Sequence, residues 1–201
     1  MKSTLINMVL VLFAITAIAS ASVGGIYLLT KEPIALAEEN AKLAALEQVL
    51  DGLAFEQTTM EAITLDDLEL EIYTAQSSAG DVIGYAINTA TMKGFSGLVR
   101  LMVGIKADGT VNNVNVISHN ETPGLGSKMA DEGNSLLGSV QNKNIGTINW
   151  EMTKNNGDIE ALTAATISSV AYADAMQRAM AAYNQVANQE ANCCQEGACD
   201  E

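Results

Sequence analysis

Histidine and cysteine are scarce in this chain. Its 201 residues include one His and three Cys, and Cys193, Cys194 and Cys199 all lie at the C-terminal end. Because zinc sites draw their ligands chiefly from these two residue types, the body of the chain cannot build a zinc site of the usual kind. The composition of the C-terminal segment fits a disordered acidic tail with incidental thiols, or else a metal site or a disulfide with a partner. We therefore assign no metal ligand.

Basic residues are also few. Ten Lys and Arg stand against 24 Asp and Glu, which gives a net charge of −14. Proteins that bind nucleic acid rely on Lys and Arg to neutralise phosphates. The composition therefore excludes nucleic acid as an expected partner.

Charged residues are missing altogether from Thr4 to Leu29, where most side chains are strongly apolar. At about 1.5 Å per residue a helix of this length spans roughly 39 Å, enough to cross a bilayer in contact with lipid. We assign residues 1–31 to a short N-terminus and a single transmembrane helix. Lys2 precedes the segment and acidic residues, beginning with Glu32, follow it. The positive-inside tendency places the N-terminus in the cytoplasm and the rest outside the cell (inner) membrane.

A cleaved signal peptide is the alternative interpretation of this segment. Ala19-Ser20-Ala21 resembles a small-residue cleavage site. The apolar run continues past that site through Tyr27-Leu28-Leu29, which favours a retained anchor.

The remaining chain divides by composition into three parts. Residues 32–52 predict a helical stalk, because Leu36–Leu50 is rich in Ala, Leu and Glu. Residues 53–188 form the main extracytoplasmic domain, and residues 189–201 form the acidic, Cys-containing tail.

Within the main domain, period-two alternation and turn signals predict several strands. The predicted strands are Leu68–Ala75, Asp81–Thr91, Leu98–Lys106, Thr110–Ser118 and Gly146–Thr153. Asp108-Gly109 between two apolar runs is a strong hairpin signal. Apolar spacings of three and four predict helices at Lys128–Val140 and Val170–Ala187. The order of elements indicates one α+β domain of antiparallel strands with flanking helices.

The loop from Ser118 to Lys128 is unusual for a plain connection. Gly124 and Gly126 flank Leu125, so the backbone can bend tightly and approach a ligand closely. The carboxylate, hydroxyl, imidazole and ammonium groups beside it belong to Glu121, Thr122, His119 and Lys128. The alternative is an ordinary turn before a helix, in which the lone His forms a structural hydrogen bond.

The stretch Thr163–Ser169, with sequence TAATISS, carries four hydroxyls and no charge, directly before the predicted helix. Such hydroxyls commonly cap a helix by accepting bonds from unpaired backbone N–H groups. A helix N-terminus also attracts anions, above all a phosphate. The pattern leaves both interpretations open.

Taken together, the two segments resemble a known family. Glu121-Thr122-Pro123-Gly124-Leu125-Gly126, and Asp158 followed by Thr163–Ser169, are similar to the FMN-binding domain of the Rnf and Na⁺-translocating NADH:quinone reductase complexes. The resemblance is strongest to the RnfG component of the Rnf electron transport complex and extends from the membrane anchor to about Asn188. Gly94-Phe95-Ser96-Gly97 and the Asp-Gly hairpin stand where that family would have them.

The resemblance implies FMN attached through a phosphoester bond to Thr166, the last residue of a motif that usually reads Ser/Thr-Gly-Ala-Thr. Ala164 stands where glycine is usual, which would be costly if that position needs a positive φ. A separate flavin transferase using FAD and Mg²⁺ would make the bond, and Lys128 would help to neutralise the phosphate. The full set of implied cofactor-binding residues is Thr166, Thr163, Ala165, Glu121, Thr122, Gly124, Leu125, Gly126 and Lys128.

The implied function is an electron relay, in which covalent FMN outside the membrane passes electrons between neighbouring membrane and redox subunits. In an Rnf-type complex, electrons flow between ferredoxin and NAD⁺, coupled to Na⁺ or H⁺ transport. Such a relay protein has no catalytic residue or substrate site of its own. Two alternatives are a membrane-anchored flavin sensor or regulator, and a pilin-like structural protein. The second lacks the glutamate expected near the start of a pilin's apolar helix.

Overall fold

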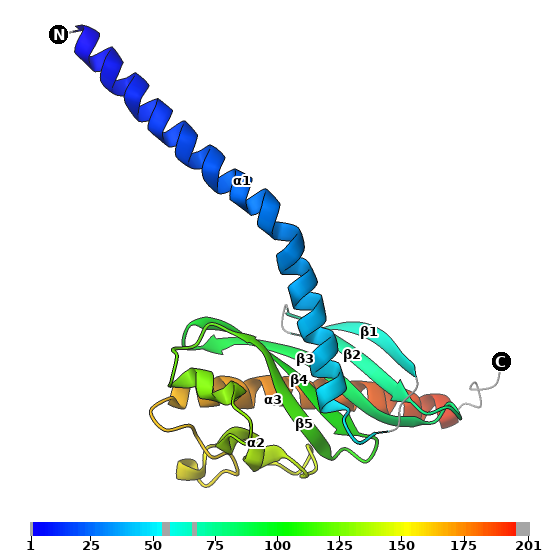
Figure 1. Cartoon of the computed structure of the whole chain (residues 1–201). Coiled ribbons are helices and arrows are strands. Elements are labelled where there is room, and N and C mark those ends of the chain that lie inside the picture. The colour runs from blue at the N-terminus through cyan, green and yellow to red at the C-terminus, as the bar shows by residue number, and fades with distance from the viewer. Residues whose placement is uncertain (1, 54–56, 66–67, 196–201) are drawn as a thin grey trace. The chain divides into compact units, whose positions relative to one another are not determined.

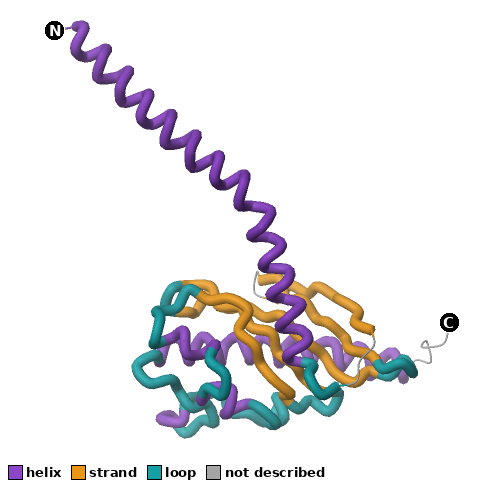
Figure 2. The backbone as a smooth tube through the Cα atoms, in the orientation of Figure 1, coloured by secondary structure: helices purple, strands orange, loops and turns teal. Residues whose placement is uncertain are grey.

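In the computed structural model of the chain, residues 2–53, 57–65 and 68–195 are described, with side chains described for residues 5–53, 57–65 and 68–187. Figures 1 and 2 show their helices and strands. The elements are α1 (Lys2–Val49), β1 (Gln57–Leu65), β2 (Leu68–Gln76), β3 (Val82–Gly94), β4 (Gly97–Lys106), β5 (Val111–His119), η1 (Gly126–Ala130), α2 (Ser135–Val140), η2 (Thr153–Asn155) and α3 (Thr166–Gln195). They form two compact units, residues 1–41 and 42–201.

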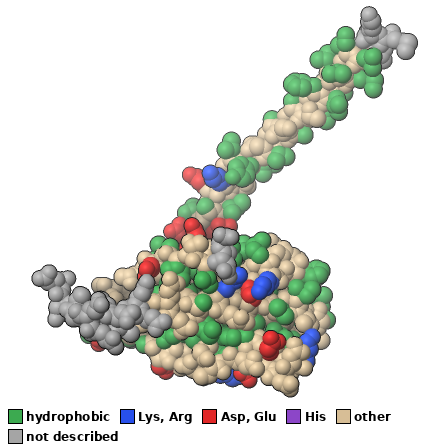
Figure 3. Space-filling model, turned by 180° about the vertical axis from the view of Figure 1, so that it is seen from behind, with side chains coloured by type: hydrophobic (Ala, Val, Ile, Leu, Met, Phe, Trp, Pro, Cys, Tyr) green, Lys and Arg blue, Asp and Glu red, His purple; other side chains and the backbone are tan. Residues whose placement is uncertain are grey.

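Helix α1 contains the apolar segment and the predicted stalk in one continuous element, which passes through Pro33. Among the described residues it is the one helix long and apolar enough to cross a membrane, by length and composition. Figure 3 shows hydrophobic side chains along its N-terminal part, and charged side chains only further along. A transmembrane helix therefore remains the interpretation of residues 5–29.

The domain is built on a five-stranded antiparallel sheet in the order β1-β2-β3-β4-β5. One row of paired residues crosses four of its strands: Ile72, Ile87, Val103 and Val114. All four are buried in the same core, as the alternation of side chains along a strand requires. The register thus places one continuous apolar face on the sheet.

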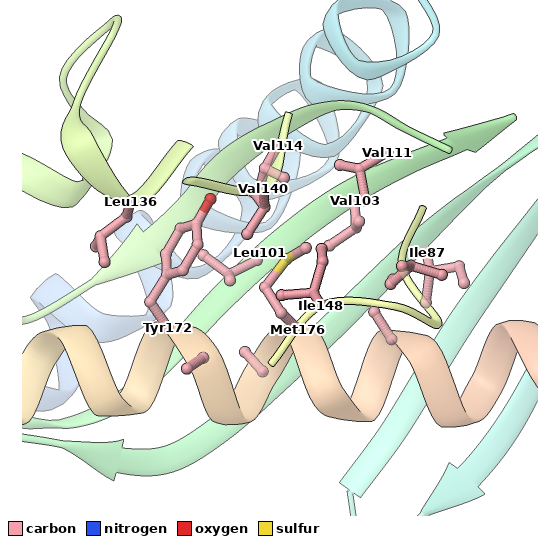
Figure 4. Packing of buried hydrophobic residues seen from close by; sticks show 14 of the residues in the cluster. Ile87, Leu101, Val103, Val111, Val114, Leu136, Val140, Ile148, Tyr172 and Met176 are labelled. Carbon is pink, nitrogen blue, oxygen red and sulfur yellow. The ribbon is translucent and has the colours of Figure 1, made fainter. Parts of the chain in front are cut away.

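Helix α3 covers that face. Its Tyr172 and Met176 are buried, and Figure 4 shows both projecting from α3 towards the labelled residues of the strands and of α2. Polar contacts add to the apolar packing, since the Thr89 hydroxyl of β3 donates to the Ala175 carbonyl at 3.0 Å. The N-terminal third of α3 is thereby held against β3, and this packing positions the candidate site.

The opposite face of the sheet is covered by the last turns of α1. Leu46, Val49 and Leu50 pack there against small residues and Met102. A Cβ at Gly104 would overlap the carbonyl of Val49, so only glycine permits this close approach of helix to strand. The side-chain amides of Asn112 and Asn113 donate to the carbonyls of Val49, Asp51 and Gln48, which satisfies the C-terminal end of the helix.

The α+β class and the antiparallel sheet are confirmed. Four predicted strands are confirmed to within three residues at their ends, as β2, β3, β4 and β5. The Asp-Gly hairpin is also confirmed, with Gly109 at φ +81° and Thr110 N–H bonded to Asp108 Oδ1. Strand β1 was not predicted, because its side chains are largely exposed and it lacks a clear apolar alternation.

The strand predicted at Gly146–Thr153 is wrong. In the described structure, the β-type pairing of this segment is one isolated bridge between Met152 and Ile159. The outer edge of β5 near Val111 is already occupied by backbone bonds with Asn142 and Lys143. The segment still buries Ile148 and Met152, which explains its strand-like apolar spacing.

The helix predicted at Lys128–Val140 is also wrong as a single element. It consists of η1 and α2, separated by a turn in which Gly133 has φ +67°. The Asn134 side chain accepts a bond from Leu137 N–H and begins α2 as a new helix. The helix predicted at Val170–Ala187 is longer at both ends, and it begins at Thr166. The tail residues Cys193 and Cys194 lie within α3 but their side chains are outside the described residues, as is all of Cys199.

The contact between the end of α1 and the sheet has a charged component at Glu71. Burial alone would raise the pKa of Glu71, but hydrogen bonds from Lys42, Asn88 and Tyr73, with the charge of Lys42, hold it below the ordinary value. Burial and the same carboxylate raise the pKa of Tyr73 to about 12.

We expect Glu71→Gln to destabilise the folded protein by about 1 kcal/mol at neutral pH. A lowered folded-state pKa gives stability that is present above the unfolded value of about 4.3 and is lost as the pH falls through the folded value. The difference between wild type and variant should therefore shrink below pH ~4. Urea unfolding in detergent across this range checks it, and a pH-independent difference would contradict the role of the Glu71 charge.

Candidate functional site

The hydroxyl-rich segment begins with a tight turn. Ala165 N–H donates to the Leu162 carbonyl at 3.1 Å, and Ala164, the third residue of this turn, has φ +61°. A positive φ at the third position is the signature of a type II turn, which favours glycine there. The turn exposes Thr163 and Ala164, buries Ala165, and leaves Thr166 exposed as the first residue of α3.

The two serines that follow are buried and hold this turn in place. Ser169 Oγ accepts a bond from Leu162 N–H and donates to the Ala165 carbonyl, each at 2.9 Å. Ser168 Oγ donates to Glu121 Oε2 at 2.5 Å. Both hydroxyls therefore hold neighbouring segments in place and do not act as the helix caps that the sequence left open.

Glu121 connects three segments at one point. The residue is 95% buried, and besides the bond from Ser168 its carboxylate accepts one from Ser96 N–H at 3.2 Å. Its own N–H donates to His119 Nδ1, so the single His forms a structural hydrogen bond. We call the arrangement of Ser96, Glu121 and Ser168 the Glu121 clasp, which joins the β3–β4 turn, the loop after β5 and the start of α3.

Two glycines leave room for the clasp. A Cβ at Gly126 would overlap Ser168 Oγ and lie 2.7 Å from Glu121 Oε2. A Cβ at Gly94 would overlap the Gly97 carbonyl and lie 2.7 Å from Glu121 Oε1. Gly94 and Gly126, which lie in motifs far apart in the sequence, therefore both leave space for the Glu121 carboxylate.

A hollow of about 410 Å³ opens over the clasp, and we call it the first hollow. Its lining residues are Phe95, Glu121, Thr122, Leu125, Gly126, Ala164, Ala165, Thr166, Ile167 and Ser168. Phe95, Leu125 and Ile167 are 65, 42 and 53% exposed, which is unusual for large apolar side chains gathered at one place. Such a surface suits a flat, largely apolar ligand.

A second hollow of about 320 Å³ lies on another side of Thr166. Its lining residues are Lys93, Trp150, Glu151, Met152, Lys154, Asn155, Thr166, Val170, Ala173, Asp174 and Gln177. Asp174 accepts bonds from Thr91, Lys93 and Arg178 at 2.6, 2.6 and 3.1 Å. Burial would raise the pKa of Asp174, but these bonds and the Lys93 charge hold it below the ordinary value.

The structure brings most of the sequence-predicted site residues together. Glu121, Thr122, Leu125, Gly126, Ala165 and Thr166 all line the first hollow. Three others, Thr163, Gly124 and Lys128, lie outside the lining of both hollows. Gly124 instead takes φ +76° in the loop, and its N–H donates to Ser127 Oγ.

Sequence reasoning missed several lining residues. Phe95 stands out in the sequence only as part of a glycine-flanked turn, and Ile167 and Ser168 only as members of the motif. Lys93, Trp150 and Lys154 carry no local pattern that marks them as site residues. Only the packing of α3 against the sheet brings them to Thr166.

The geometry agrees with comparisons to known proteins. Residues 94–181 match the FMN-binding domain family, and residues 1–49 match the RnfG N-terminal region. The corresponding component of the ion-translocating oxidoreductase complex from Aliivibrio fischeri is 33% identical over 87% of this chain and 87% of its own length. The chain belongs to the RnfG family.

Two further members of the RnfG family align with most of this chain. The component from the Na⁺-translocating ferredoxin:NAD⁺ oxidoreductase complex of Acetobacterium woodii is 27% identical over 88% of this chain and 90% of its own length. The component from the ion-translocating oxidoreductase complex of Vibrio vulnificus is 31% identical over 82% of this chain and 84% of its own. The FMN-binding domain match begins at Gly94 and ends within α3, so it includes the Glu121 clasp and nearly all of the residues that line the two hollows.

Ala164 offers a direct test of the turn. A non-glycine residue in the left-handed region costs about 1 kcal/mol, so we expect Ala164→Gly to stabilise the protein by roughly that amount. Thermal or urea unfolding in detergent measures the change. The control is Ala161→Gly, at a position without positive φ, which should give no gain. Equal effects of the two substitutions would contradict the proposed strain at Ala164.

Proposed function

We propose that this chain is a membrane-anchored subunit that carries FMN covalently on Thr166 and relays electrons within an Rnf-type ion-translocating oxidoreductase complex. The observation that carries the proposal is that an exposed Thr166 lines a hollow within the FMN-binding domain match. The RnfG-family relatives support membership of such a complex. Other membrane and redox subunits would be the electron-transfer partners.

The residues of the first hollow fit a flavin. Phe95, Leu125 and Ile167 offer exposed apolar surface to a flat ring, and Gly126 keeps the floor free of a Cβ. Bound FMN would supply the capacity to accept and release one or two electrons. The chain's own part is to hold that group at a fixed place and to shield one side of it from water. No separate substrate site is needed for this role.

Attachment would require a partner enzyme. The Thr166 hydroxyl oxygen would form an ester bond to the FMN phosphorus of FAD, the bond from that phosphorus to AMP would break, and AMP would leave. The hydroxyl proton would pass to a base of the flavin transferase, with Mg²⁺ balancing the phosphate charge. The exposed position of Thr166 supports access by such an enzyme.

The same proposal places the domain outside the membrane. The apolar part of α1 would span the bilayer in contact with lipid, with Lys2 on the cytoplasmic side. A covalent bond suits that location, because FMN released outside the membrane would be lost to the cell. By analogy with the Acetobacterium woodii relative, the electrons would travel between ferredoxin and NAD⁺.

The experiment is a denaturing gel of the full chain from its native membranes, viewed under ultraviolet light before staining. Intact-mass measurement accompanies it. A fluorescent band, heavier than the unmodified chain by one FMN less one water, is the expected result. A dark band of unmodified mass, from cells that contain the transferase, would overturn covalent attachment.

A further inference from the structure

Thr166 stands at the boundary of two hollows with different chemistry. It lines both the first hollow and the second hollow. A phosphate esterified to the Thr166 hydroxyl is bonded directly to that oxygen. It therefore has to occupy either the first hollow or the second hollow. The charges around the two hollows indicate which of them is the more favourable for the phosphate.

The first hollow is unfavourable for an anion. Glu121 is its one ionisable lining residue, and its carboxylate is buried. Its large exposed side chains, Phe95, Leu125 and Ile167, are apolar, and Thr122 adds an exposed hydroxyl but no charge. A phosphodiester placed here would meet the carboxylate of Glu121, and no Lys or Arg lines this hollow to offset that charge.

The second hollow contains two lysines, Lys93 and Lys154. Lys93 Nζ lies 2.6 Å from Asp174 Oδ1 while its side chain remains 60% exposed, so the ammonium is anchored and still accessible. Lys154 is exposed and forms no ion pair with any residue in the described ranges. Both ammonium groups are therefore available to a further anion.

Two acidic residues, Asp174 and Glu151, also line the second hollow. The Asp174 carboxylate is engaged by two cations at once, since Arg178 Nε lies 3.1 Å from its Oδ2. Glu151 is exposed and its carboxylate accepts a bond from the Asn155 amide. Among the lining residues, Lys93 and Lys154 balance these two carboxylates, so the hollow is neutral in a chain whose net charge is −14.

An unused donor also belongs to this hollow. Trp150 is one of its lining residues, and the Trp150 Nε1–H group is buried without a hydrogen-bond partner among the described parts of the chain. Buried polar groups are normally hydrogen-bonded, and this N–H group is left unsatisfied in a residue that lines the hollow. A phosphate oxygen is a strong acceptor.

We propose that the second hollow is the phosphodiester subsite of the flavin attached to Thr166, with Lys93 and Lys154 as its cationic ligands. This rests on the proposed covalent FMN. The flavin then lies across Thr166, with its phosphate over the second hollow and its ring over the first. Asp174, Thr91 and Arg178 act as positioning residues, because they hold Lys93 at the edge of the hollow.

The test compares Lys93→Met/Lys154→Met with wild type in the full chain in detergent. The matched control is Lys143→Met, which removes an exposed lysine beside the start of β5, at the far end of the sheet. The first readout is the rate of covalent attachment with purified flavin transferase, FAD and Mg²⁺, followed by intact mass. The second readout is the ³¹P chemical shift of the attached phosphodiester at low and high ionic strength.

We expect attachment to the double variant to be about tenfold slower than to wild type, since two exposed charge contacts are lost. In wild type the ³¹P shift should move with salt as the lysine charges are screened, and in the double variant it should move much less. The control should behave as wild type. Lys93→Arg/Lys154→Arg should restore most of the rate, because the charge is kept.

The outcomes separate the two proposals. A wild-type chain that gains no flavin overturns covalent attachment, and the subsite with it. Normal attachment and an unchanged ³¹P response in the double variant overturn the subsite alone. If the double variant misfolds through loss of the Lys93–Asp174 pair, Lys154→Met decides, because Lys154 has no described ion pair to lose.

Discussion

Replacing Thr166 with alanine is expected to remove covalent flavin completely and to leave the fold intact. The hydroxyl oxygen is the proposed attachment atom, and alanine offers no substitute. Thr166 is exposed at the first position of α3, and no described hydrogen bond involves its side chain. We therefore expect a stability change within about 0.5 kcal/mol of zero.

Ultraviolet fluorescence on a denaturing gel and intact mass measure this loss, and urea unfolding measures the stability. Thr166→Ser keeps the hydroxyl and should retain part of the flavin. Thr59→Ala, at an exposed position on β1, controls for threonine removal in general and should carry the wild-type amount. A flavin adduct on the Thr166→Ala chain would place the attachment at another residue and contradict the proposal.

Gly126→Ala is the substitution with the next largest expected effect. The new methyl group would overlap Ser168 Oγ and press on Glu121 Oε2, and these two atoms are bonded to each other. Making room requires the Ser168–Glu121 bond to break inside a buried site, at a cost of about 2–3 kcal/mol. Because the Glu121 clasp forms the floor of the first hollow, we also expect flavin attachment to fall strongly.

Urea unfolding and flavin content measured on the same sample check both effects. The control is Gly138→Ala in α2, where an added Cβ meets nothing within 4 Å, so helix propensity should stabilise the protein by up to about 1 kcal/mol. In Gly126→Ala/Ser168→Ala the overlap with the hydroxyl is removed. The double variant should then lose less stability than the sum of the two single variants. Strict additivity would show that the strain lies elsewhere.

Local patterns predicted the parts of the fold that depend on near neighbours. Strand β2 shows period-two alternation, apolar runs bounded by turn residues mark β3 to β5, and Asp108-Gly109 defines the turn between β4 and β5. The segment Gly146–Thr153 misled the same reasoning, because its apolar residues reach the core without pairing in the sheet. Strand β1 was missed for the opposite reason, since it pairs with β2 while its side chains remain exposed.

The candidate site was predicted from two short motifs, and most of their residues line the first hollow. The sequence also marked Ala164 as a departure from the usual glycine. Its positive φ gives the physical meaning of that departure, because a type II turn needs a left-handed third residue. Lys128 was the sequence-based choice for the phosphate, whereas the lysines that line a hollow with Thr166 are Lys93 and Lys154.

The sequence by itself determined the apolar segment of α1, the α+β class and the position of Thr166, because each depends on residues close together in the chain. Only the tertiary structure decided how the site is assembled. Ser168 and Glu121 are 47 residues apart, and Lys93 and Asp174 are 81 apart. These pairs meet because α3 packs across the sheet and brings its N-terminal turns to the end of β3 and to the segment between β5 and η1. That packing depends on apolar burial over the whole domain, which no local pattern contains.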